Sequence, residues 1–71
     1  PFVIDLHLTT AGAVDIELFN TLGARVYRSS LNLQEGKHRL PLDHSLLTPG
    51  AYYLKVQFPD GTQLLEKVLR Q

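Results

Sequence analysis

The most constraining feature of this sequence is that its apolar residues recur at every second position. Over residues 2–9 the even positions are apolar, whereas Asp5 and His7 belong to the opposite face. The same alternation runs through residues 14–19 and through residues 52–58. Successive side chains of a β-strand point to opposite faces, whereas a helix repeats every 3.6 residues. The pattern therefore predicts strands with one buried face, and we find no convincing helix in it.

Turn-forming residues separate the alternating segments. Residues 20–23, Asn-Thr-Leu-Gly, are typical of a tight hairpin turn, because Asn20 can bond nearby backbone and Gly23 tolerates a positive φ. Residues 59–62, Pro-Asp-Gly-Thr, carry a strong hairpin signal. The pair at 49–50, Pro-Gly, matches the centre of a type II turn.

Short strands separated by turn signals indicate an antiparallel sandwich or barrel. We expect strands at 2–9, 14–19, 25–28, 31–34, 38–42 and 63–70. The strand that follows Pro49-Gly50, with its alternating faces over residues 52–58, is expected to be the longest. Pro41 cannot donate to a ladder, so its strand is expected to lie at an edge or to end there. The predicted fold is an all-β, immunoglobulin-like antiparallel sandwich of about seven short strands.

The last predicted strand alternates less regularly than the others. Leu65 and Leu69 share one face, whereas Leu64 and Val68 share the other. That pattern suits a strand partly covered on both faces, or one that awaits a partner. An unprotected edge also favours a homodimer formed by edge-strand pairing.

The size and charge of the chain exclude several classes of protein. Its 71 residues make one domain, which buries only about 60% of the surface of its unfolded chain. The absence of cysteine excludes disulfides and thiolate metal sites. Seven basic and seven acidic side chains cancel, so no net field attracts nucleic acid or an anionic membrane. No apolar run approaches the roughly 20 residues of a membrane helix.

No group of residues has the pattern of a catalytic site. Asp43, His44 and Ser45 are the residue types of a hydrolase triad, but consecutive side chains project in different directions and cannot converge. The five glycines are isolated turn residues, so there is no phosphate-binding loop. We therefore expect a protein that is not an enzyme and that uses no cofactor.

Metal binding has little support in the sequence. His7, His38 and His44 have no ligand spacing between them. Asp5 and His7 are neighbours on one strand face, and a weak surface metal site is the alternative to a solvated pair. The solvated pair is the preferred interpretation.

Two surface features are candidates for binding. A basic run at Lys37, His38 and Arg39, with Arg25 and Arg28 placed nearby, is a candidate contact for lipopolysaccharide or nucleic acid. A solvated strand face is the simpler interpretation, and no nucleic acid is expected as a partner. Two tyrosines, Tyr27 and Tyr53, are the candidates for a sugar-binding platform, since Tyr52 shares the apolar register of its strand.

Four segments occur in an order and spacing that resemble a known family. Residues 14–26 hold a strand, a Leu-Gly turn and a basic residue, and residues 31–38 pass through a glycine into the next strand. Residues 46–56 hold the pattern Pro-Gly-x-Tyr-x-Leu-Lys-Val, and residues 67–71 form a short basic and apolar ending. The motif positions are Leu22, Gly23, Arg25, Gly36, Pro49, Gly50, Tyr52, Leu54, Lys55 and Val56. Together they resemble the C-terminal sorting domain (type A) of type IX secretion system cargo proteins in Bacteroidetes.

The resemblance covers essentially the whole chain. Pro1-Phe2 is similar to the Asn-Pro start of such domains, with the asparagine lost. Two departures do not affect the fold: Ala51 stands where a larger aliphatic residue is common, and Ala24 separates the Leu-Gly turn from Arg25. We expect residues 1–71 to be a single sorting domain excised from a longer protein, with any processing site outside it.

The resemblance implies a non-catalytic secretion signal. Such a domain follows a covalently linked N-terminal passenger, is recognised by the type IX translocon, and is removed by a sortase-like protease. The passenger passes through the periplasm and is then secreted or held at the outer membrane and cell surface, where it can be attached to anionic lipopolysaccharide.

Translocon recognition is expected to rest on the last strand and its end. A strand with exposed backbone can be recognised by β-augmentation, in which a partner adds a strand to the sheet. The residues proposed for this role are Lys67, Val68, Leu69, Arg70 and Gln71. The alternative function is a structural or carbohydrate-binding immunoglobulin- or fibronectin-like accessory module of a surface protein, and a self-assembling hook-cap-like domain ranks third.

Overall fold

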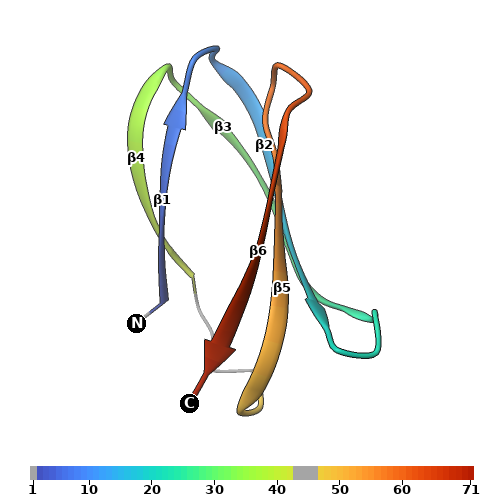
Figure 1. The fold of residues 1–71 in the computed structure, drawn as a ribbon. Helices are drawn as coiled ribbons and strands as arrows, with labels where there is room; N and C mark the ends of the chain where they lie inside the picture. Colours follow the sequence, from blue (N-terminus) through green and yellow to red (C-terminus); the bar gives the residue numbers. More distant parts are fainter. Residues whose placement is uncertain (1, 43–46) are drawn as a thin grey trace.

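The computed structural model describes residues 2–42 and 47–71, and these form two antiparallel sheets packed face to face (Figure 1). The small sheet pairs β1 with β4, and the large sheet has the order β3-β2-β5-β6. The strands are β1 (Phe2–Leu8), β2 (Gly12–Asn20), β3 (Arg25–Leu33), β4 (Gly36–Leu42), β5 (Gly50–Gln57) and β6 (Gln63–Arg70). The predicted all-β, immunoglobulin-like sandwich is confirmed.

The described residues form six strands, not about seven. The segments expected as two strands at 25–28 and 31–34 are one strand, β3, of nine residues. Ser29 and Ser30 continue its ladder, because Ile16 and Asp15 stand opposite them on β2. The strand at 52–58 is also not the longest, since β2 and β3 have nine residues each and β5 has eight.

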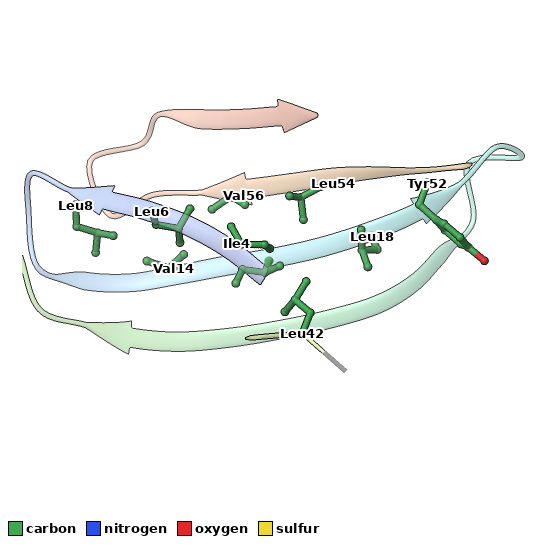
Figure 2. Close-up of a cluster of buried hydrophobic side chains, with 10 residues drawn as sticks. Ile4, Leu6, Leu8, Val14, Leu18, Leu42, Tyr52, Leu54 and Val56 are labelled. Carbon is green, nitrogen blue, oxygen red and sulfur yellow. The ribbon is translucent and has the colours of Figure 1, made fainter. Parts of the chain in front are cut away.

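The core lies between the inner faces of the two sheets (Figure 2). Strands β1, β2 and β5 each contribute alternate residues to it, and β4 adds one near its end. The buried side chains in the described residues are Ile4, Leu6, Leu8, Val14, Ile16, Leu18, Leu42, Tyr52, Leu54 and Val56. Burying such a side chain stabilises the fold by about 1.5–3 kcal/mol, so the period-two pattern supplies the main driving force.

The two hairpins of the large sheet are built alike. In the β2–β3 hairpin, the Gly23 N–H donates to the Asn20 carbonyl (3.0 Å) and the Asn20 N–H donates to the Ala24 carbonyl (2.9 Å). In the β5–β6 hairpin, Phe58 exchanges the corresponding bonds with Gly61 and Thr62. The glycines have φ values of 85° and 91°, which side chains with a Cβ adopt at a cost. Both predicted hairpin turns are confirmed.

Side chains stabilise each hairpin loop. The Asn20 Oδ1 accepts bonds from the N–H groups of Leu22 and Ala24, both at 3.0 Å. In the other loop, Asp60 Oδ1 accepts bonds from the N–H and the hydroxyl of Thr62, at 2.9 and 2.6 Å. These bonds lower the pKa of Asp60, because they stabilise its charged form.

The type II turn expected at Pro49-Gly50 is absent. Gly50 has a φ of 150°, far from the roughly 80° that the third position of such a turn requires. It opens β5 instead, opposite Arg70 of β6. The expectation for Pro41 is confirmed, because β4 pairs only with β1 among the described strands and so lies at an edge.

Figure 1 places both chain termini at one end of the sandwich. The β2–β3 hairpin lies at that same end, whereas the β1–β2 and β5–β6 loops lie at the opposite end. Those two loops contact each other, since the Thr9 hydroxyl donates to Asp60 Oδ2 at 3.5 Å. The start of β1 and the end of β6 therefore lie at the same pole of the molecule.

Substituting one buried and one exposed side chain tests this assignment of the strand faces. The substitution Ile16→Ala should lower the free energy of unfolding by about 2–5 kcal/mol, since Ile16 is fully buried. The matched change Leu65→Ala should alter it by no more than about 0.5 kcal/mol, because Leu65 is 70% exposed. Urea denaturation measures both, and equal losses would contradict the assigned faces.

Candidate functional site

The polar side chains of the small sheet line one open surface hollow, at Asp5, His7, Lys37, His38 and Arg39. Asp5 pairs with Arg39 across the small sheet (Nε–Oδ1 3.0 Å), and this bond raises the pKa of Arg39. No three His, Cys, Asp or Glu side chains gather within residues 2–42 and 47–71. Asp43, His44 and Ser45 lie outside the described residues. Among the described residues there is no helix that is long and apolar enough to cross a membrane.

The basic run predicted as an anion contact is divided between two faces. Lys37 and Arg39 stand opposite His7 and Asp5 on the outer face of the small sheet. The alternation turns His38 the other way, and its Nε2 lies 2.7 Å from the Gln34 carbonyl oxygen. Arg25 and Arg28 lie on β3 of the large sheet, so the prediction that they sit near this run is wrong.

The two candidate tyrosines lie on opposite faces of the large sheet. Tyr27 stands in register with buried Leu18 and packs against the core. Tyr53 stands opposite Phe19 and is 48% exposed. They cannot form one stacking platform, which removes the main support for a sugar-binding surface.

Most of the family-motif residues have a structural role. Gly23 occupies a hairpin position with positive φ, and Gly36 opens β4 with a φ of 117°. Leu54 and Val56 are buried in the core. Arg25 forms an ion pair with Glu17 of β2 (Nη1–Oε2 3.1 Å). The remaining positions are Leu22, which is 91% exposed at the hairpin tip, with Pro49, Gly50, Tyr52 and Lys55 in or beside β5.

Tyr52 makes a contact that the sequence does not reveal. Its hydroxyl donates to the Thr48 carbonyl at 2.6 Å and lies 3.2 Å from the Thr48 hydroxyl oxygen. The ring is buried, and a buried tyrosine hydroxyl needs a partner. This is the arrangement of the tyrosine corner of immunoglobulin-like sandwiches, and it anchors the chain where it enters β5.

The last strand presents an unpaired edge. Among the described strands β6 pairs only with β5, so its other side has no neighbour. Leu64 and Val68 are half-buried against the core. Leu65 and Leu69 point outwards and are 70% and 71% exposed. The interpretation that both faces are partly covered is therefore wrong, whereas a strand that awaits a partner fits this geometry.

The predicted recognition residues all lie at the end of this edge strand. Lys67, Val68, Leu69 and Arg70 belong to β6, and Gln71 follows it. Lys67 stands opposite Tyr53, and Leu69 stands opposite Ala51. Val68 is the apolar side chain of this group that packs against the core.

Comparison with known proteins decides between a sorting signal and another module of the same fold. A family model described as "Secretion system C-terminal sorting domain" matches residues 1–70. The chain belongs to this family. The sorting domain is therefore a type IX secretion signal, which interacts with the type IX machinery and leads to export to the outer membrane or cell surface. No curated protein and no solved structure matches the chain.

The anchoring role of Tyr52 can be tested by comparing the loss of its hydroxyl with the loss of the Tyr53 hydroxyl. Tyr52→Phe should lower the free energy of unfolding of the sorting domain by about 0.5–1.5 kcal/mol, because it removes a part-buried hydrogen bond to Thr48. Tyr53→Phe removes the same atom from an exposed ring and should change it by less than about 0.5 kcal/mol. Chemical denaturation compares the two variants, and an equal effect would contradict the anchoring role.

Proposed function

We propose that residues 1–71 are the C-terminal secretion signal of a longer protein. They direct a covalently linked N-terminal passenger from the periplasm through the type IX system, and a sortase-like protease then removes them. The observation that carries this proposal is the family match over residues 1–70. The passenger is thereby secreted or retained at the cell surface.

The translocon recognises the sorting domain through β6 and its end, at Lys67, Val68, Leu69, Arg70 and Gln71. An unpaired edge exposes a row of backbone N–H and C=O groups, and a partner strand can bond to them. Two observations support this assignment: β6 has a free edge among the described strands, and Leu69 is 71% exposed beside it.

The translocon can recognise the end of β6 because the core of the domain does not depend on residues 67–71. No side chain of residues 67–71 is among the buried ones, and Val68 is only half-buried. Within the described part of the chain, the ten buried side chains lie on β1, β2, β4 and β5. Removing residues 67–71 therefore leaves the core contacts of those strands in place, at the cost of part of the β5–β6 ladder.

A truncation tests the proposal. A reporter with a signal peptide is fused through the native upstream linker to residues 1–71, or to a version that ends at Glu66, in a bacterium with type IX secretion. The full domain should place the reporter on the surface or in the medium, and the shortened domain should leave it in the periplasm. Circular dichroism of the shortened domain should still show β structure, although it should unfold at a lower temperature.

The competing predictions give different results in the same assay. If the shortened domain secretes as well as the full one, recognition does not lie in residues 67–71. If the reporter stays in the periplasm with both, the structural or carbohydrate-binding accessory module becomes the better explanation. A homodimer through the same edge is the other prediction from the sequence, and sedimentation of the isolated domain measures it.

A further inference from the structure

The outer side of β6 carries a cation between two exposed apolar side chains. Leu65, Lys67 and Leu69 lie on this side, and we call them the outer stripe. The two leucines are 70% and 71% exposed. Tyr53, which is 48% exposed, stands opposite Lys67 on β5 and extends the apolar surface. Large apolar side chains exposed together on an edge strand mark an interaction site or an aggregation hazard.

Lys67 has no acidic neighbour on its side of β5 and β6. The residues of these two strands that share this side are Ala51, Tyr53, Lys55, Gln57, Gln63, Leu65, Lys67 and Leu69. The adjacent Glu66 points to the other face. The nearest acidic side chain in the sheet register is Glu17 on β2, which lies opposite Lys55 and is bound to Arg25 at 3.1 Å. The charge of Lys67 is therefore not balanced within its own surface.

A second copy of the chain does not fit this stripe well. When two β6 strands pair antiparallel so that each Leu65 meets the other copy's Leu69, the two Lys67 side chains stand opposite each other. A parallel pairing in register also places lysine opposite lysine. Like charges directly opposite each other destabilise a strand pair. Lys67 therefore acts against self-pairing while leaving the edge open to a different strand.

An anionic membrane surface is the rival partner for this side. The outer side of the large sheet carries Asp15 and Glu17 on β2, next to β5. Arg25 binds Glu17 at 3.1 Å and Arg28 stands opposite it on β3, so the net charge of this side does not reject a lipid surface. A partner strand differs from a membrane because it also bonds to the open backbone ladder of β6, which lipid headgroups do not extend as a strand does.

We propose that the outer stripe selects an acidic strand of the secretion machinery. That partner strand pairs along the free edge of β6 and carries an acidic side chain facing Lys67, with apolar side chains facing Leu65 and Leu69. Opposed side chains of paired strands have Cβ atoms about 4.5–5.5 Å apart, which suits one ion pair between two apolar contacts. This inference rests on the proposed recognition of β6, and it adds Leu65 and Tyr53 to the residues that take part.

Matched charge reversals test this inference in the secretion assay. Lys67→Glu should reduce the secreted fraction of the reporter at least tenfold, and Lys67→Arg should keep it within twofold of the native domain. The control is Lys37→Glu, the same change on the outer face of the small sheet, which should also stay within twofold. Replacing Leu65 and Leu69 together by asparagine should reduce secretion at least tenfold. All variants change exposed side chains, so their unfolding midpoints in urea should match that of the native domain.

The outcomes separate this inference from the proposed function. If the version ending at Glu66 is not secreted but Lys67→Glu is secreted normally, β6 is recognised without an acidic partner and the inference is wrong. If the truncation itself has no effect, the proposed function fails first. Two further results would overturn the inference: a wild-type dimer in sedimentation that Lys67→Glu dissociates, or binding to vesicles of phosphatidylethanolamine and phosphatidylglycerol that Lys67→Glu abolishes.

Discussion

The contact between the inner faces of β1, β2 and β5 is the interaction on which the rest of the molecule depends. Each strand contributes three alternate buried side chains, and the chain has no cysteine with which to reinforce them. Within the described ranges, no cluster of metal-ligating residues reinforces the fold either. A domain of this size therefore relies on apolar burial and on hairpins that fix the register of its strands.

The unequal width of the two sheets explains why β6 is available. The small sheet has two strands and the large sheet has four, so the central strands of the large sheet are covered better than its edges. The inner residues of β2 and β5 are buried, whereas Leu64 and Val68 of β6 are only half-buried. An edge strand of this sheet is thus both weakly held by the core and open along one ladder, and β3 shares these features with β6. A partner can bind β6 without competing with the main packing.

The faces of the strands and the two hairpins follow from the sequence because they depend on local rules. Alternation assigned the buried positions, and the glycines at 23 and 61 marked the hairpin loops. Features that depend on the folded arrangement could not be predicted from the sequence. Ser29 and Ser30 extend β3 because β2 lies beside them, and the Tyr52 hydroxyl donates to the Thr48 carbonyl. The same holds for the candidate site. The sequence placed residues 67–71 at the end of the last strand, whereas the position of Lys67 opposite Tyr53 required the register of β5 and β6.

The position of both termini at one pole has a consequence for whatever is joined to the chain (Figure 1). A body attached at the N-terminus projects from the pole at which β6 ends, and its bulk shields that end first. Because a strand rises about 3.3 Å per residue, Leu65 stands about 13 Å farther from this pole than Leu69. A short tether would therefore mask Leu69 while Leu65 stays accessible. Tether length is thus a variable that sets how much of the strand a neighbouring protein can reach.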